Sequence, residues 1–278
     1  MNLKNFLKKA QKEKWAIGQF NFSNLEILKA AVFTAKKMNS PIILGISEGE
    51  AKFFGLKEAV AIVKILRKIW PPIFLNLDHG KSFGIIKDAL DVGYDCVHFD
   101  GSELTLKENI KNTREVVKYA KKKGVLVEGE VGIIAKAGEE GILTDSSDVL
   151  NFIKEAEVNS LAVSIGNVHG IDFSGENPHL DLKRLREISE KLKNKVFLVL
   201  HGGSGTPKED LKKAIKLGVV KINISTELRL AYTNTLKKVL SEKPNEIRPY
   251  KYLPKVIEAA QKVVEEKILL FGSDKKRY

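Results

Sequence analysis

The fold is decided by a short apolar run that ends in a histidine and a glycine-rich turn, VFLVLHGGSG at 196–205. Its branched and aromatic side chains are typical of a buried strand, and the glycines after His201 predict a turn. A helical pattern with proline in its first turn follows at Thr206-Pro207. The stretch therefore predicts a strand, a tight turn and a helix in immediate succession.

The same succession recurs along the whole chain. Apolar runs alternate with segments whose apolar residues are spaced by three and four, as at Leu25, Leu28 and Val32. Several of these segments end at a glycine before the next apolar run, as at Gly93 and Gly124. The strands expected are 16–21, 41–47, 73–78, 96–100, 125–131, 160–165, 196–201 and 219–225.

This alternation predicts an α/β fold, a (β/α)8 TIM barrel that forms one domain over 1–278. A doubly wound sheet is the alternative. The amphipathic segment 2–14 is expected to close the bottom of the barrel, and a helix at about 253–270 is expected to form a C-terminal helical extension. The carboxyl ends of barrel strands share one rim, so residues scattered along the chain would meet there.

Composition excludes several classes of function. The 278 residues carry 47 Lys and Arg against 35 Asp and Glu, a formal net charge of +12, but the lysines are spread over every helical segment. We therefore expect no nucleic-acid partner, although a positive field favours an anionic metabolite. No apolar run could span a bilayer, no signal-peptide pattern is present, and the lone Cys96 can form no internal disulfide. These features predict a cytoplasmic protein that does not bind membranes.

Three of the five histidines follow predicted strand ends and precede glycine, namely His79, His169 and His201. Three such imidazoles at one rim predict a metal site with an open position for water or substrate, the arrangement of a catalytic zinc. His98 lies inside a strand, so packing is the better interpretation of it than ligation. His179 is expected at the surface or at a helix cap.

An aspartate, Asp78, directly precedes His79. On a regular strand the two side chains would point to opposite faces, so both can reach one site only if the chain turns at the rim, which Gly80 permits. Asp78 would then be a general acid and base beside the metal. The competing interpretation makes it an N-cap for the helix near Ser82.

Two turns are candidates for binding phosphate. Gly202 to Gly205 follow the seventh strand, and Thr226 opens the helix after the eighth. Backbone N–H groups of such turns bind anions, and barrels often bind phosphate at these two loops.

An acidic loop follows the fifth strand. Glu128 and Glu130 fall on one face of that strand, which runs into Gly138-Glu139-Glu140-Gly141. Carboxylates on such a loop can close over a substrate and move a proton, or the loop can simply be solvated. The residues alone leave both interpretations open.

Eight motifs together resemble one known family, the class II, zinc-dependent fructose-bisphosphate aldolases, which include tagatose-bisphosphate aldolases. The resemblance covers nearly the whole chain, with the motifs in the family's order and spacing. The motifs are GQFN (18–21), ISEG (46–49), LDHG (77–80), DGS (100–102), EGEVG (128–132), IGNVHG (165–170), LHGGSG (200–205) and KIN (221–223).

The resemblance implies an enzyme that reversibly cleaves fructose 1,6-bisphosphate to dihydroxyacetone phosphate and glyceraldehyde 3-phosphate, in glycolysis and gluconeogenesis. The implied metal ligands for Zn²⁺ are His79, His169, His201 and, when the metal shifts, Glu130. Asp78 would handle the proton on the C4 hydroxyl, and Glu140 in the acidic loop would take the proton that leaves when the carbanion forms.

The resemblance also implies a set of residues that bind the sugar phosphate, with a monovalent cation, Na⁺ or K⁺, nearby. They are Asn21, Ser47, Gly170, Gly202, Gly203, Ser204, Asn223, Ser225 and Thr226. Arg248 or Lys251 would reach the remote phosphate, because the family's arginine before the last helix is replaced here. Relatives are dimers or tetramers, so a homodimer or homotetramer is expected.

Three other functions remain open. Ser225 does not separate a fructose-bisphosphate from a tagatose-bisphosphate aldolase. Lys221 on the eighth strand could instead serve a Schiff-base aldolase. The acidic loop is about ten residues shorter than is usual in the family, so the chain could also be a phosphate-binding barrel with impaired catalysis.

Overall fold

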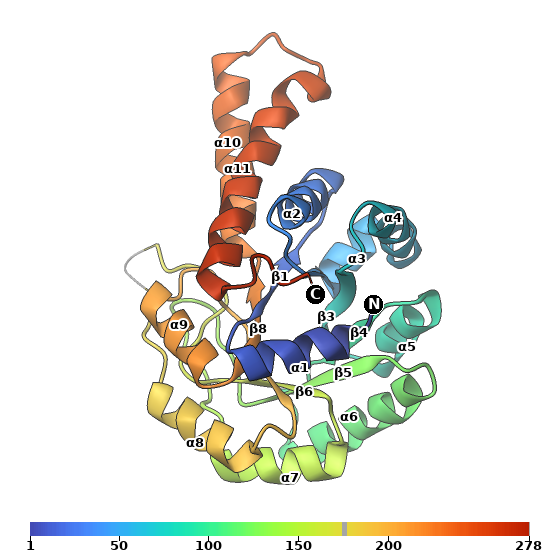
Figure 1. The fold of residues 1–278 in the computed structure, drawn as a ribbon, viewed down its shortest axis with the longest axis vertical. Coiled ribbons are helices and arrows are strands. Elements are labelled where there is room, and N and C mark those ends of the chain that lie inside the picture. The colour runs from blue at the N-terminus through green and yellow to red at the C-terminus, as the bar shows by residue number, and fades with distance from the viewer. Residues whose placement is uncertain (174–176, 278) are drawn as a thin grey trace.

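The structure is a computed structural model that describes residues 1–173 and 177–277. Its eight strands form a closed barrel in which every strand pairs in parallel with its neighbours in sequence and β8 pairs with β1 (Figure 1). The strands are β1 Ile17–Asn21, β2 Ile42–Ser47, β3 Ile73–Gly80, β4 Cys96–Phe99, β5 Leu126–Val131, β6 Ser160–Val163, β7 Phe197–Leu200 and β8 Val219–Ile224. The predicted TIM barrel is confirmed, and the doubly wound sheet is wrong.

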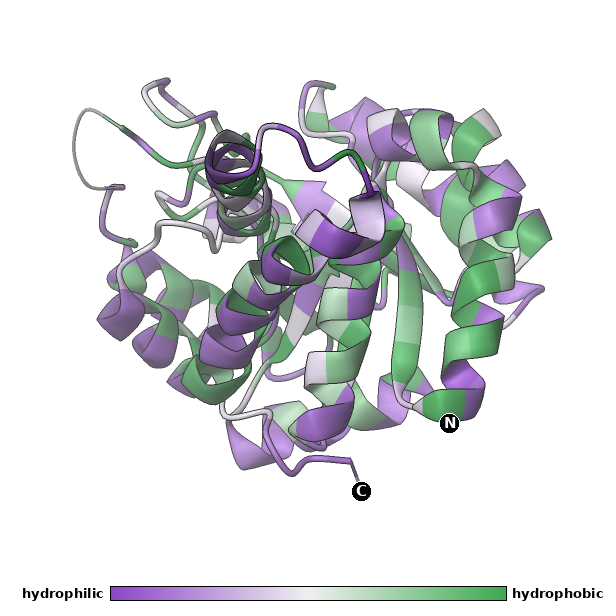
Figure 2. Ribbon diagram, turned by 90° about the horizontal axis from the view of Figure 1, so that it is seen from above, coloured by the Kyte–Doolittle hydropathy of each residue, from purple (hydrophilic) through white to green (hydrophobic). Residues whose placement is uncertain are grey.

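Helices surround the barrel, one or two after each strand. They are α1 Leu3–Glu13, α2 Leu25–Lys37, α3 Glu48–Phe54, α4 Leu56–Ile69, α5 Phe83–Val92, α6 Leu106–Lys121, α7 Ser146–Ala156, α8 Leu182–Leu192, α9 Lys208–Lys216, α10 Thr226–Glu242 and α11 Pro249–Phe271. These helices have a hydrophobic side that packs on the strands and a hydrophilic side that faces solvent. Hydrophobic and hydrophilic residues therefore alternate along the helices in Figure 2.

Local sequence signals explain where several elements begin and end. β7 is buried along its whole length, as expected of a parallel strand covered on both faces. The side chain of Ser82 accepts a hydrogen bond from the Ile85 N–H and caps α5, so the capping role considered for Asp78 belongs to Ser82. The helix ends at Gly93, which adopts the left-handed conformation with φ of 105°.

The N-terminal helix α1 closes the amino-terminal end of the barrel. Leu3, Phe6 and Leu7 pack in a separate core cluster with the first residues of several strands, including Ile17 and Phe74. The Phe6 and Phe74 rings meet edge to face with centroids 5.6 Å apart. This plug leaves the opposite end, where the strands finish, as the open face.

The C-terminal extension is a pair of long helices, α10 and α11, that projects beyond the barrel in Figure 1. α11 begins at Pro249, four residues before the predicted start, because proline is tolerated in the first turn of a helix. It packs against α10 and α2. None of the described helices has the length and apolar character that a membrane span needs.

The plug predicts a stability effect. Phe6→Ala should lower the free energy of unfolding by about 3 kcal/mol, because it removes a buried ring and leaves a cavity beside Phe74. Urea unfolding followed by circular dichroism measures the change. Phe53→Ala is the control, because Phe53 is 79% exposed and its loss should change stability by less than about 0.5 kcal/mol. Equal effects of the two variants would contradict the role given to α1.

Candidate active site

The site begins with a break in the barrel wall at the end of β3. The β3–β4 register shifts between Leu77 and Gly80, and His79 adopts the left-handed conformation with φ of 51°. The predicted turn therefore falls on His79 and not on Gly80, which is instead packed closely: an added Cβ would lie 2.7 Å from Ile86 Cγ1. Because of the break, Asp78 and His79 both line the same pocket.

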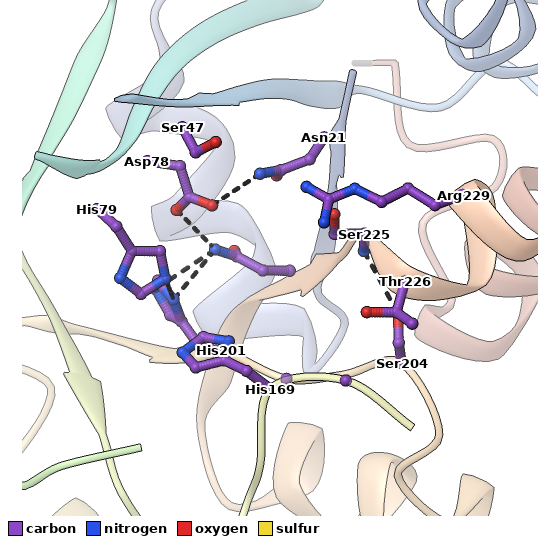
Figure 3. Close-up of a pocket in the computed structure, with 13 residues that line it drawn as sticks. Asn21, Ser47, Asp78, His79, His169, His201, Ser204, Ser225, Thr226 and Arg229 are labelled. Carbon is purple, nitrogen blue, oxygen red and sulfur yellow. Dashed lines mark hydrogen bonds between the residues drawn. The ribbon is translucent and has the colours of Figure 1, made fainter. Parts of the chain in front are cut away.

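That pocket lies at the carboxyl ends of the strands (Figure 3). It is lined by Asn21, Ser47, Asp78, His79, His169, Gly170, His201, Gly202, Ser204, Asn223, Ser225, Thr226 and Arg229. Most of the residues singled out from the sequence are thus brought together. Glu130 and Gly203 are buried but do not line it, Glu140 lies outside it, and Arg229 was not foreseen.

Two imidazoles point their free nitrogens at each other. His79 Nδ1 lies 2.8 Å from Asp100 Oδ2, and His201 Nε2 lies 2.7 Å from Glu128 Oε1. Each carboxylate accepts a ring hydrogen, so His79 Nε2 and His201 Nδ1, 2.9 Å apart, are the nitrogens left to face a metal, the first of them after it has lost its own proton. Converging lone pairs with carboxylates behind them are how proteins present histidine to a metal. This donor set fits a divalent cation.

His169 completes a group of three imidazoles. Its ring centroid is 4.9 Å from that of His79 and 6.0 Å from that of His201. The His169 N–H donates to the Ala135 carbonyl, and the His169 carbonyl accepts from the Ala137 N–H. The acidic loop is therefore more than a solvated connection, because its backbone holds His169 in place.

A second group of possible ligands lies beside the first. One ligand atom each from His79, Asp100 and Glu130 lies within 4.8 Å of the others, and the same holds for Asp78, His79, His98 and His201. His98 is fully buried in β4, as expected, yet its ring centroid is only 4.8 Å from those of His79 and His201. Strand alternation could have shown that His98 and Asp100 share a face.

Buried charges set the protonation of the site. Burial lowers the pKa of His169 to about 4 and that of His201 to about 3, so both are neutral at pH 7. Burial also acts to lower the pKa of His79, but its acidic neighbours, Asp78 foremost, raise it to about 9. The position between these rings therefore attracts positive charge.

The carboxylates are held in the ionised form. Burial acts to raise the pKa of Asp78, but the nearby His79 and His201 hold it well below its ordinary value. Burial also acts to raise the pKa of Glu128, but Lys221 and the nearby histidines together outweigh it, so that this pKa too is lowered. Both groups are therefore available as bases or hydrogen-bond acceptors at neutral pH.

Lys221 is part of this charge network. Its Nζ lies 2.7 Å from Glu128 Oε2, both side chains are buried, and Lys221 does not line the pocket. A Schiff-base nucleophile needs a free amine that touches the substrate. The geometry instead makes Lys221 a support for Glu128 and, through it, for His201.

Amide side chains fix the Asp78 carboxylate. Asn21 Nδ2 donates to Oδ2 over 2.9 Å, and Asn223 Nδ2 donates to Oδ1 over 3.1 Å. At the pocket edge, Arg229 pairs with buried Glu50 over 2.8 Å, and the same carboxylate accepts from the Ser47 hydroxyl. Arg229 escaped the sequence analysis because a charged residue in the first turn of a helix is ordinarily a surface residue.

The other side of the pocket is built for an anion. Gly202 has φ of 67°, and a Cβ there would lie 2.1 Å from the Val168 carbonyl oxygen, so only glycine fits. α10 begins beside it, where the N-cap residue Ser225 makes no capping hydrogen bond and the Ser204 hydroxyl accepts from the Glu227 N–H. The Ser225 hydroxyl is buried and has no hydrogen-bond partner among the described residues. A helix start that opens on the pocket and an unsatisfied hydroxyl suit a phosphate group.

Comparisons with known proteins agree with this geometry. A family model described as fructose-bisphosphate aldolase class-II matches residues 1–276. The chain is 37% identical to the fructose-bisphosphate aldolase of Geobacillus stearothermophilus, over 99% of this chain and 98% of that protein. It is 38% identical to the 6-phospho-5-dehydro-2-deoxy-D-gluconate aldolase of Bacillus subtilis, over 98% and 96%.

A solved structure extends the comparison to the fold. The crystal structure of the YdjI aldolase from Escherichia coli K12 superposes with a TM-score of 0.87 at 29% identity, over 100% of this chain and 99% of that one. The chain belongs to the class II fructose-bisphosphate aldolase family. It is an aldolase, a lyase, and family membership makes it metal-dependent, in accordance with the histidine cluster.

The raised pKa of His79 predicts how this class II aldolase takes up its metal. Because His79 would have to lose a proton to bind a metal, the apparent affinity for added zinc should rise about tenfold per pH unit up to about pH 9, then level off. His169 and His201 add no proton in this range. Competition with a chelator at several pH values measures the slope.

Zinc binding at pH 7.5 should release about one proton per zinc, which calorimetry in buffers of different ionisation enthalpy measures. His179→Ala is the control, because that ring is exposed and paired with Asp210 away from the pocket. A zinc affinity that does not change between pH 6 and 9 would contradict the assignment.

Proposed function

We propose that this class II aldolase reversibly cleaves fructose 1,6-bisphosphate to dihydroxyacetone phosphate and glyceraldehyde 3-phosphate, with Zn²⁺ held by His79, His169 and His201. The observation that carries the proposal is that His79 Nε2 and His201 Nδ1 face each other, 2.9 Å apart, beside an ionised aspartate. When bound, Zn²⁺ supplies the Lewis acidity that polarises the substrate ketone.

Asp78 moves the proton of the C4 hydroxyl. Its carboxylate lines the pocket, is ionised at neutral pH, and is held by two amide donors, so it is oriented to accept a proton as the C3–C4 bond breaks. Glu140 is the proposed acceptor of the second proton. Its side chain is exposed in the loop, so this role requires the loop to close over the pocket.

The two phosphates bind at opposite sides of the pocket. The ketose phosphate binds where Gly202, Ser204 and Ser225 meet the start of α10, with Na⁺ or K⁺ nearby. The remote phosphate binds Arg229, which is the one guanidinium group in the lining described for this pocket. Arg248 does not line the pocket of its own chain and pairs with Glu246.

A second candidate substrate is 6-phospho-5-dehydro-2-deoxy-D-gluconate, on which a 38% identical relative is named to act. Its cleavage also yields dihydroxyacetone phosphate, but the aldehyde product ends in a carboxylate instead of a phosphate. Arg229 can pair with either anion. Tagatose 1,6-bisphosphate differs only in the configuration at C4, beside Asp78, and is the third candidate.

Assembly and location complete the proposal. The projecting α10–α11 pair, with exposed Ile247 and Tyr250 near its tip, favours a homodimer or homotetramer that would bring Arg248 or Lys251 to the pocket of a neighbouring copy. The buried, unpaired Cys96 is in keeping with a reducing cytoplasm.

Two variants separate the metal from the proton transfer. Asp78→Asn should retain about one zinc per chain and lose turnover by about 10²–10⁴-fold, because the base is removed while the imidazoles remain. His201→Ala should lose both zinc and turnover, because a ligand is removed. Metal analysis and an assay for dihydroxyacetone phosphate measure these effects. Near-normal turnover of Asp78→Asn would remove that residue from its role.

Three candidate substrates and three arginine variants test the specificity. Fructose 1,6-bisphosphate should have the highest kcat/KM of the three, and Arg229→Ala should raise its KM by about 10–100-fold with a smaller change in kcat. Arg186→Ala, exposed on α8, is the control. A larger effect of Arg248→Ala would indicate that Arg248, and not Arg229, binds the remote phosphate.

Faster cleavage of 6-phospho-5-dehydro-2-deoxy-D-gluconate would indicate that the second candidate is the substrate. If none of the three substrates is cleaved, the chain is a phosphate-binding barrel with impaired catalysis.

A further inference from the structure

His98 is a buried histidine with no part in the reaction proposed above. It lies in the middle of β4, and its side chain is completely shielded from solvent. Buried polar side chains are costly unless they form hydrogen bonds, so an imidazole in a barrel wall needs a reason. The surroundings of its two ring nitrogens supply one.

Nδ1 of His98 is an acceptor. The His79 backbone N–H donates to it over 3.2 Å, at the point where the β3–β4 register is broken. The ring thus replaces the backbone partner that a regular ladder would provide for His79. A neutral imidazole has one N–H, so the hydrogen of the His98 ring is on Nε2.

Nε2 of His98 points at Glu130. It lies 3.4 Å from Glu130 Oε2, and neither atom has a hydrogen-bond partner within the described part of the chain. Both side chains are almost fully buried, so water cannot easily satisfy them. A buried donor beside a buried acceptor forms a hydrogen bond after a small adjustment of either side chain.

We propose that His98 is a positioning residue that couples Glu130 to the turn at His79. The His79 amide fixes the tautomer of the ring, and the Nε2–H of that ring orients the Glu130 carboxylate beside the His79 imidazole. This inference rests on the proposed function, in which Glu130 is an auxiliary metal ligand. It assigns His98 a role that packing alone does not require.

Direct ligation by His98 is the competing role, and the hydrogen bonds disfavour it. Ligation through Nδ1 would leave the buried His79 N–H without its acceptor. Ligation through Nε2 would move the ring hydrogen to Nδ1, where it would face the same N–H. Either change removes the contact that holds the turn.

Two amide variants separate the nitrogens of His98. The amide of Asn can occupy the position of Nδ1 and accept from His79, but it cannot reach Glu130. The longer Gln can place an N–H at the position of Nε2 and donate to Glu130. Glu130→Gln is the reference, because it keeps the shape of the side chain and removes its charge.

The measurements are the zinc dissociation constant, the visible spectrum of the cobalt-substituted protein and kcat. His98→Asn and Glu130→Gln should each weaken zinc binding by about 10-fold and alter the cobalt spectrum in the same way. The double variant should be no worse than either single one, because both remove the same interaction. His98→Gln should stay within about 3-fold of the parent. Additive losses, or equal losses in the Asn and Gln variants, would overturn the proposal.

The tautomer of His98 can be measured directly in the parent protein, with one variant used only to assign the signal. Long-range ¹H–¹⁵N spectra of the purified protein, with and without added zinc, should show the His98 hydrogen on Nε2, the signal being assigned by its loss in His98→Asn. A hydrogen on Nδ1 in both samples would overturn the proposal, whatever the zinc affinities of the variants. A protein that binds no zinc but shows the Nε2 hydrogen would overturn the proposed function and leave the tautomer established.

Discussion

The site depends on one backbone conformation, the left-handed turn at His79. A regular β3 would direct Asp78 and His79 to opposite faces of the barrel wall, and the proposed base and metal ligand could not share a pocket. The turn costs about 1–2 kcal/mol for a residue with a side chain, and hydrogen bonds to the His79 amide and ring offset that cost. The chain thus uses conformational strain at the rim to place two functional groups side by side, and the rest of the barrel holds them there.

The buried charges around this turn form a connected network and not a set of separate pairs. Lys221 supports Glu128, Glu128 holds the hydrogen of His201, and Asp100 holds that of His79. A carboxylate that accepts the hydrogen of an imidazole makes the other ring nitrogen a stronger ligand for a metal, and it fixes which nitrogen is free to bind. These buried carboxylates favour positive charge beside them, which is why the pKa of His79 is raised and why a divalent cation would be held there. Removing one member should therefore disturb its neighbours as well.

The barrel can be predicted from the sequence because local patterns mark each of its strands and helices. Apolar runs bounded by glycine, and helices with a regular apolar spacing, placed each strand close to its observed bounds. The gathering of rim residues followed from the topology alone. The position of the turn did not, because Gly80 is the usual residue for such a conformation, and the choice of His79 depends on tertiary contacts to β4. The same reason hid the partners of His98 and the place of Arg229, since strand and helix patterns give the face of a residue but not its neighbour. Glu140 is exposed in its loop, so its proposed role depends on a movement of that loop toward the pocket.

The three imidazoles differ in how they are supported, and this difference has a kinetic consequence. His201 is completely buried and tied to Glu128, whereas His169 is partly exposed and held only through the backbone of a short loop. If these imidazoles hold the metal as proposed, an incoming ion would meet the partly exposed His169 before the buried His201. Exchange of the metal should then depend on the opening of that loop, so the segment between β5 and α7 would control the access of the ion as well as carry Glu140.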